Sequence, residues 1–265
     1  MKKKFDFKKL YLALILLFFY APIVYVIVFS FNESRSLTNL TGFSLRWYEK
    51  MFKSRSMMES IYYSILIAVI ATVVSTIVGT LASIGLSKSN KIIREVVTQV
   101  NNLPMLNPDI VTAIGFMLFF SSLSIPTGFG TLLLAHIAFC IPYVMLSVSP
   151  KLRQLDDNIA EAALDLGCTP MQALTKVILP QIKEGVFSGA LVAFMMSFDD
   201  FVISYFTTGP GINNISTYVY STSKRINPSI NALSTLIVLA ITMVLIVVNV
   251  VPRIRQRRKR NEKVA

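Results

Sequence analysis

Hydrophobic residues in this chain are gathered into long runs, and charged residues are confined to the gaps between them. Four stretches of 23, 28, 41 and 27 residues contain no Lys, Arg, Asp or Glu: residues 10–32, 60–87, 110–150 and 226–252. About 20 apolar residues of helix cross a hydrocarbon core roughly 30 Å thick, so the longest stretch is sufficient for two crossings. The pattern indicates a protein with several membrane spans.

The runs do not alternate between apolar and polar residues, as the strands of a membrane barrel do, so each span is expected to be a helix. Pro126, Gly128 and Gly130 divide the longest run with a turn. The sequence therefore predicts an all-α fold with six spans, and residues 1–265 are expected to form a single transmembrane domain. The expected spans are at about 10–31, 61–86, 104–122, 131–149, 185–206 and 231–251.

The distribution of positive charge predicts the orientation of these spans. Lys and Arg number 26 against 14 Asp and Glu, and seven of the 26 lie in residues 253–263 and five in residues 2–9. If both termini are on one side of the membrane, that side carries 19 Lys and Arg and the other side carries 7. Cytoplasmic segments are enriched in these residues, so both termini are expected in the cytoplasm. The placement indicates anchoring beside a lipid bilayer and not binding of nucleic acid.

The remaining chemistry-bearing residues are sparse. Cys140 lies in an apolar run and Cys168 in a hydrophilic loop, and no Cys or His spacing predicts a metal site or a disulfide. His136, the one histidine, is expected to be a hydrogen-bonded core residue.

The expected cytoplasmic segment 151–183, named the elbow here, has the signals of two short helices. Asn158 with Glu161 three residues later is an Asx variant of the capping box, and Gly167 is a typical C-terminal stop. Residues 169–172, Thr-Pro-Met-Gln, form a second start signal, and Pro180 is expected to end or kink the second helix. Taken on spacing alone, the elbow is as consistent with a structural brace as with a docking site.

The identities within the elbow resemble the EAA loop of permease subunits of binding-protein-dependent ABC importers. Glu161-Ala162-Ala163, three residues, Gly167, nine residues and residues 177–180 (Val-Ile-Leu-Pro) match that pattern, with Val177 in place of Ile. The resemblance implies a type I ABC importer permease fold, and an elbow that docks on a separate ATPase subunit present in two copies. The residues implied in this coupling are Glu161, Ala162, Ala163, Gly167, Leu179 and Pro180.

The chain itself is not expected to be an enzyme or to hold a cofactor. It contains no Gly-Lys dipeptide and hence no phosphate-binding loop of the Gly-x-x-x-x-Gly-Lys-Ser/Thr type. The resemblance implies that the partner ATPase binds ATP and Mg²⁺.

Three carboxylates interrupt the expected spans: Asp199 and Asp200 in the fifth and Asp109 near the start of the third. Each costs roughly 2.5–3.5 kcal/mol at a helix centre, so such groups face a cavity or a partner charge. On a continuous helix, Asp200 lies on a small, polar stripe with Ser197 and Ser204, whereas Asp199 lies on a bulky one. Asp200 is therefore expected to face a path for a cation and Asp199 to pack, although a buried ion pair or hydrogen bond remains an alternative for each.

Phe198, Phe201 and Tyr205 lie beside Asp200 at helical spacing. Aromatic faces next to a carboxylate suit an ammonium group, although the same spacing is typical of packing.

Residues 197–210, together with residues 107–111, resemble the second permease subunit of spermidine/putrescine importers, and the similarity runs over most of the chain. The resemblance implies a polyamine importer in the bacterial inner membrane. It also implies a second homologous permease subunit and an extracytoplasmic polyamine-binding protein as partners.

Other functions remain open at this point. A permease for another cation or small solute would share the elbow but not necessarily the two aspartates. A proton-coupled secondary transporter would use the aspartates as a proton relay, and it predicts transport without ATP. A signalling or scaffolding subunit gives the carboxylates inside the membrane no purpose.

Overall fold

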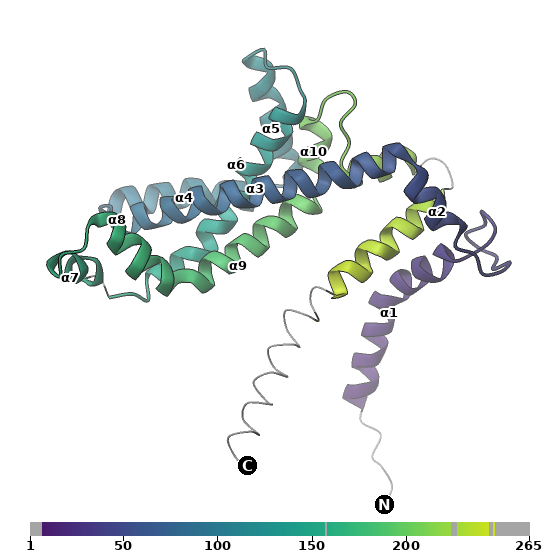
Figure 1. Ribbon diagram of the computed structural model, residues 1–265, viewed down its shortest axis with the longest axis horizontal. Helices are drawn as coiled ribbons and strands as arrows, with labels where there is room; N and C mark the ends of the chain where they lie inside the picture. The colour runs from purple at the N-terminus through teal and green to yellow at the C-terminus, as the bar shows by residue number, and fades with distance from the viewer. Residues whose placement is uncertain (1–6, 157, 224–226, 244–245, 247–265) are drawn as a thin grey trace, which may run out of the picture. The chain divides into compact units, whose positions relative to one another are not determined.

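The computed structural model describes residues 7–156, 158–223, 227–243 and 246, and these residues are almost entirely helical (Figure 1). Within them the expected all-α fold is confirmed, and an isolated bridge between Asn32 and Phe43 is the only extended pairing. The helices are α1 (Phe7–Ser30), α2 (Arg46–Lys53), α3 (Arg55–Ser87), α4 (Lys91–Leu106), α5 (Asp109–Ser122), α6 (Phe129–Leu152), α7 (Ile159–Asp165), α8 (Pro170–Gln172), the π-helix η1 (Ala173–Ile178), α9 (Leu179–Phe198), α10 (Val202–Thr207) and α11 (Ile215–Thr222). A further apolar helix covers Ser229–Met243.

Four helical segments in the described residues are long and apolar enough to cross a membrane: Leu10–Ser30, Arg55–Ser87, Phe129–Leu152 and Pro170–Phe198. A fifth is added if α4 and α5, which meet at a bend of 107°, are counted as one span. The expected third span at 104–122 is therefore wrong in its outline, because α4 continues past Pro104 to Leu106 and α5 begins only at Asp109. The expected sixth span reaches beyond Met243 and lies partly outside the described residues.

The chain divides into two compact units, residues 1–58 with 219–265 and residues 59–218. The second unit, named the core unit here, holds α4 to α10 and most of α3. Whether the whole chain acts as a single domain stays a prediction.

Small residues hold the core unit together. Helix α6 packs along α9, and Val144 of α6 lies against Gly189 of α9 and against Gly79 of α3. A Cβ atom added at Gly79 would lie 2.9 Å from the Val144 side chain, and one added at Gly189 would lie 3.2 Å from Val144 Cα. Glycine thus permits the close approach on which helix packing in membranes depends, since lipid provides no hydrophobic drive between helices.

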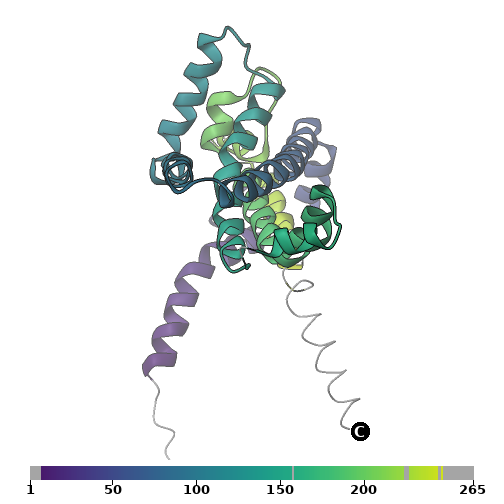
Figure 2. The ribbon, with the colours of Figure 1, turned by 90° about the vertical axis from the view of Figure 1, so that its left-hand side faces the viewer.

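Helix α10 packs against both α5 and α6 at one end of α9 (Figures 1 and 2). The buried side chains between these helices form the apolar core of the unit and include Ala113, Phe120, Phe139, Val144, Ala193 and Ile203. This packing fixes where α9 ends and α10 begins.

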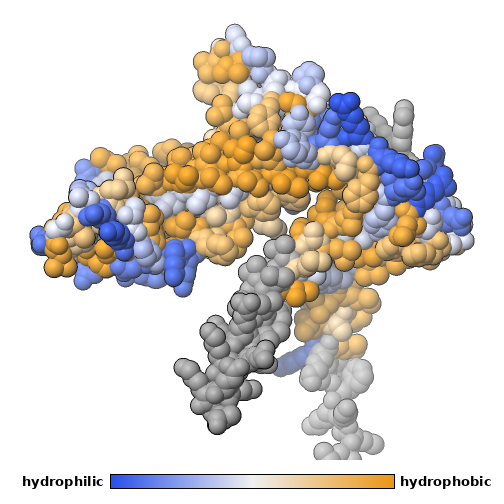
Figure 3. Space-filling view, in the orientation of Figure 1, coloured by the Kyte–Doolittle hydropathy of each residue, from blue (hydrophilic) through white to orange (hydrophobic). Residues whose placement is uncertain are grey.

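Apolar side chains cover the surface along α3 and α4, and at the end of the core unit that bears α7 and α8 hydrophilic side chains lie among apolar ones (Figure 3). A helix that spans a bilayer needs an apolar surface along its length and polar groups near its ends.

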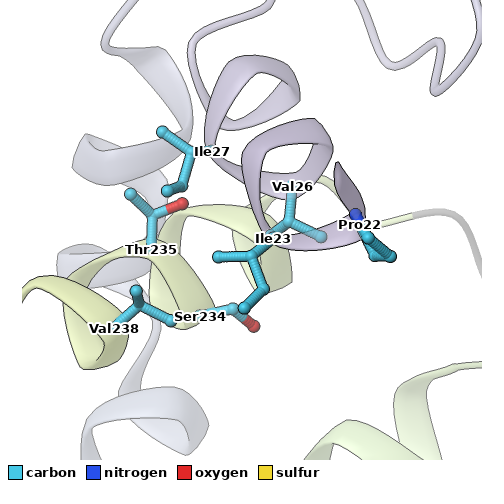
Figure 4. A pocket seen from close by; sticks show the side chains of 7 residues that line it. All are labelled: Pro22, Ile23, Val26, Ile27, Ser234, Thr235 and Val238. Atoms are coloured by element: carbon cyan, nitrogen blue, oxygen red, sulfur yellow. The ribbon is translucent and has the colours of Figure 1, made fainter. Parts of the chain in front are cut away.

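In the other unit, α1 and the helix Ser229–Met243 line a small, open pocket (Figure 4). Its volume is about 200 Å³, and its lining is apolar except for the hydroxyls of Ser234 and Thr235. Because no charged residue lines it, this pocket offers nothing to a charged ligand.

Candidate functional site

The fifth span is broken at the two adjacent aspartates. Helix α9 ends at Phe198 and α10 begins at Val202, so the expected continuous helix over 185–206 is wrong. The three residues between the helices, Asp199, Asp200 and Phe201, interrupt the regular hydrogen bonding of helical backbone groups. In lipid, such groups must be satisfied by the protein or line a cavity, so the break is a structural feature that needs partners.

Asp200 provides partners for the start of α10. Its carboxylate accepts the backbone N–H of Ile203 at 3.2 Å and that of Ser204 at 2.7 Å, and its side chain is only 7% exposed. These bonds satisfy two of the N–H groups that the first turn of a helix leaves unpaired, as an N-terminal cap does.

Asp199, in contrast, is exposed at the C-terminal end of α9. Asp200 is therefore buried and hydrogen-bonded, as in the alternative expectation, whereas Asp199 does not pack as expected, and the composition of the two stripes explains why. The small stripe with Gly189, Ala193 and Ser197 is buried and faces α6, whereas Met195 on the bulky stripe is 52% exposed. Inside a membrane, small residues mark helix contacts and not a cavity.

His136 joins the two sides of the break. Its Nδ1 lies 2.8 Å from Ser197 Oγ at the end of α9, and its Nε2 lies 3.0 Å from Ser204 Oγ in α10. The Nε2 atom is also 3.5 Å from Asp200 Oδ2, and the His136 side chain is 1% exposed. The expectation of a hydrogen-bonded core histidine is confirmed.

Asn214 completes this buried arrangement from the loop after α10. Its Nδ2 donates to the backbone carbonyl of Asp200 at 3.1 Å and to Ser204 Oγ at 2.6 Å. His136, Ser197, Asp200, Ser204 and Asn214 are named the polar cluster here. Sequence reasoning missed the roles of Ser197, Ser204 and Asn214, because nothing in their spacing brings residue 214 back to the break.

Several aromatic residues near the break are in ring contact with one another. Phe198 stacks on Phe194 with ring centroids 5.7 Å apart, and Phe201 lies 5.5 Å from Tyr205, which is 49% exposed. Asp109 is exposed in the first turn of α5, and the structure does not bring it into the polar cluster. Of the six predicted path residues, only the five at 198–205 therefore lie together.

The elbow has the expected turn. Gly167 has a φ of +85°, Cys168 N–H donates to Ala163 carbonyl at 3.0 Å, and Gly167 N–H donates to Leu164 carbonyl at 2.9 Å. This pair of bonds is the Schellman motif, which satisfies the carbonyls at the end of α7. The second start signal is also confirmed, because Thr169 and Gln172 form a reciprocal capping box with Pro170 in the first turn.

One local expectation for the elbow is wrong. The Asn158 side chain makes no capping bond, and its backbone N–H instead donates to the Asp156 carboxylate at 2.9 Å. Pro180 does not end the second helix, because residues 170–198 form one uninterrupted helical segment, and the expected kink at this proline stays a prediction. The π-helix η1, in which Leu179 N–H reaches Leu174 carbonyl, lies just before this proline.

The elbow presents apolar side chains outward. Leu164, Leu166 and Met171 are 43%, 87% and 67% exposed. Of the predicted coupling residues, Glu161 and Ala162 are exposed, whereas Ala163 is buried and α7 packs against η1. Exposed apolar groups on a short, rigid helix pair are typical of a surface that binds another protein.

Comparison with known proteins agrees with this geometry. Residues 75–261 match the family model described as binding-protein-dependent transport system inner membrane component. The putrescine transport system permease protein PotI of Escherichia coli K12 is 35% identical over 235 residues, 86% of this chain and 84% of the relative. The spermidine/putrescine transport system permease protein PotC of the same organism is 35% identical over 237 residues, 89% of this chain and 90% of the relative.

Solved structures support the fold. A subunit of a bacterial ABC transporter that imports the acidic polysaccharide alginate superimposes with a TM-score of 0.68 at 17% identity, covering 93% of this chain and 94% of that chain. At this identity the likeness shows the fold alone. The fold, the family model and the relatives together establish that the chain belongs to the binding-protein-dependent transport system inner membrane components, the permease subunits of ABC importers.

Proposed function

We propose that this chain is a transmembrane permease subunit of an ATP-driven importer of polyamines such as spermidine and putrescine. The observation that carries the proposal is one uninterrupted helical segment, residues 170–198, that joins the elbow to the break beside Asp199. The permease relatives named for putrescine and for spermidine/putrescine support the substrate class.

The continuous segment provides the mechanical link that such a transporter needs. An ATPase that moved the elbow would move the far end of α9, because the α8–η1–α9 rod contains no loop that absorbs the displacement. In this proposal two ATPase subunits bind the elbows of this chain and of a second, homologous permease subunit. An extracytoplasmic polyamine-binding protein delivers the substrate, and ATP and Mg²⁺ are bound by the ATPase.

The proposed topology has six spans and cytoplasmic termini. The fifth span then runs outward from the elbow, and at about 1.5 Å per residue the break lies roughly 20 Å from Gly185 along the helix. Asp199 is thereby placed in the outer part of the bilayer, where it meets an arriving cation. A carboxylate at that depth offsets part of the desolvation cost of a polycation.

The path prediction is tested by comparing the two aspartates in proteoliposomes that contain the complete importer. Asp199→Asn is expected to raise the KM for spermidine about tenfold at unchanged membrane abundance, which corresponds to about 1.4 kcal/mol of lost binding. Asp200→Ala is expected to lower abundance or thermal stability, since the loss of a cap costs about 1–2 kcal/mol. Initial rates of ATP-dependent uptake and quantitative immunoblots measure the two effects.

Glu95→Gln, which removes an exposed carboxylate from α4, is the matched control and is expected to leave the KM unchanged. Uptake that proceeds equally without ATP would favour a proton-coupled carrier. A KM for spermidine that does not change in Asp199→Asn would contradict the cation path.

A further inference from the structure

Asn214 joins the start of α11 to the break through the two ends of its side-chain amide. Its Oδ1 accepts the backbone N–H of Thr217 at 2.9 Å and the Thr217 hydroxyl at 2.8 Å, and so caps α11. Its Nδ2 donates to the carbonyl of Asp200 at 3.1 Å and to Ser204 Oγ at 2.6 Å. Asn214 is only 3% exposed, so its bonds are shielded from solvent.

The orientation of this amide is fixed by its backbone partners. A backbone N–H only donates and a backbone carbonyl only accepts, so Thr217 identifies Oδ1 and Asp200 identifies Nδ2. Ser204 Oγ therefore accepts from Nδ2, and its own hydrogen is available for His136 Nε2, which is 3.0 Å away. A side chain that keeps an acceptor at this position and loses the N–H donors would retain the cap and release the break.

The start of α11 is also bound to α3. The N–H of Ile215 donates to Ser64 Oγ at 2.7 Å, although the two residues are 151 positions apart in the chain. Ser64 is buried, as is Asn214. Through this bond, a displacement of α3 would be transmitted to the residue next to Asn214.

The loop that precedes Asn214 is bound to the N-terminal end of α6. Thr131 Oγ1 donates to the carbonyl of Thr207 at 2.9 Å, and a Cβ atom added at Gly209 would overlap the backbone of Thr127. Asn214 is therefore held by contacts on both of its sides in the chain. Because these contacts do not involve the break, Asn214 can act as a fixed point for it.

The bonds from Asn214 reach the residue directly after Asp199. The carbonyl of Asp200 is held by Asn214, and its carboxylate accepts the N–H groups of Ile203 and Ser204. Asp200 is thus fixed at its backbone and at its side chain. Asp199 is joined to it by one peptide bond, so the orientation of Asp200 limits the directions in which the Asp199 carboxylate can point.

We infer that Asn214 is a positioning residue for transport, which fixes the backbone at Asp200 relative to α3 and α11 and thereby sets how Asp199 is presented to the substrate. Asn214 itself is buried and does not contact the substrate. The inference rests on the proposed function for the role of Asp199 in the path. It adds a route by which the positions of α3 and α11 determine the geometry of that path.

The test measures the KM for spermidine in proteoliposomes that contain the complete importer. Serine caps helices as well as asparagine does, but it is too short to reach Asp200 and has no N–H donor. Asn214→Ser is expected to raise the KM about tenfold with little change in the maximal rate, because two buried hydrogen bonds to the break are lost. If Asn214→Ser does not fold, Asn214→Asp serves, since aspartate also caps and has no N–H donor.

Thr217→Val is the matched control. It removes a buried hydroxyl from the cap side of the same amide and leaves both Nδ2 bonds in place. It is expected to lower the midpoint of thermal unfolding at least as much as Asn214→Ser does, and to leave the KM unchanged. A purely structural role of Asn214 would give the two variants the same KM.

The double variant Asn214→Ser with Asp199→Asn tests whether Asn214 acts through Asp199. If it does, the two effects overlap, and the KM is expected to rise about tenfold instead of the roughly hundredfold rise of independent effects. A rise of about a hundredfold would overturn the positioning role.

The remaining outcomes separate the inference from the proposed function. A normal KM in Asn214→Ser, together with a raised KM in Asp199→Asn, would overturn the inference while the proposed function stands. A normal KM in Asp199→Asn would instead overturn the proposed cation path, and the inference that rests on it.

Discussion

Adjacent residues of the same type have different roles in this chain. Asp199 and Asp200 have identical side chains, but one is exposed at the end of a helix and the other caps the start of the next helix. Their roles are set by backbone conformation, because Asp199 is the C-cap residue of α9 whereas Asp200 precedes the start of α10. A pattern of residue types alone cannot distinguish the roles of the two aspartates. Assigning each residue to a helix face assumes a continuous helix, and the helix is interrupted at this point.

Gly167 is the residue at which coupling can be tested with one substitution. Its φ of +85° is in the left-handed region, and a Cβ there would meet no atom within 4 Å, so conformation and not space excludes other residues. A β-branched residue costs about 1–3 kcal/mol in that region and would alter the angle between α7 and α8. Gly167→Val is expected to reduce uptake and transport-stimulated ATP hydrolysis together while membrane abundance is maintained.

The control for this prediction is Gly85→Val, an exposed glycine of α3 with open space around it and no positive φ. Normal uptake in Gly167→Val, with the elbow still helical by crosslinking, would exclude the coupling role of this turn.

At the scale of elements, the close contact between α6 and α9 determines the geometry of the break. Gly189 lets the helices approach so closely that an added Cβ would be 3.2 Å from Val144 Cα and 3.3 Å from Ser147 Cβ. Gly189→Leu is expected to push α9 away from α6, to separate Ser197 from His136 and to destabilise the core unit by about 1–3 kcal/mol. The midpoint of thermal unfolding in detergent measures the loss.

Gly115→Leu in α5 has no atom within 4 Å of the added Cβ and serves as the comparison. Equal midpoints for Gly189→Leu and Gly115→Leu would mean that the α6–α9 contact does not limit stability.

The sequence predicted much of the element order, since long apolar runs and capping signals are local. It placed the Gly167 turn and the Thr169 capping box correctly, because both depend on residues within a few positions of one another. It failed at the break, whose partners His136 and Asn214 come from α6 and from the loop after α10. Sequence reasoning also assigned the stripe of small residues on α9 to a cavity. The reason is that sequence alone does not show which face of a helix another helix covers.

At the scale of the whole molecule, the chain is an inner membrane permease subunit with helices apolar enough to cross a bilayer and exposed apolar side chains on its elbow. Family membership identifies this role more narrowly than the fold does. A solved structure with the same fold belongs to a transporter involved in the import of an acidic polysaccharide. The fold alone therefore does not decide the substrate class.

The orientation of the chain gives a further prediction. If the Lys and Arg distribution determines topology, a fluorescent reporter that folds only in the cytoplasm will be active when fused after Ala265 and inactive when inserted after Gly211. Alkaline phosphatase, which is active only outside the cytoplasm, should give the opposite pattern. The reverse result for both reporters would invert the proposed direction of α9.

The π-helix before Pro180 also sets a rotational phase. Each turn of η1 closes over one residue more than an α-helical turn, and a single residue corresponds to about 100° of rotation and 1.5 Å of advance. Removing one residue from η1 would replace a π-helical turn by an α-helical one, and because each is one full turn, the elbow and the aspartates would keep their relative direction. Removing one residue from α9 would instead turn one relative to the other by about 100°, more than a quarter of a revolution. The π-helical turn therefore takes up one extra residue between the elbow and Asp199 without changing the direction in which either of them faces.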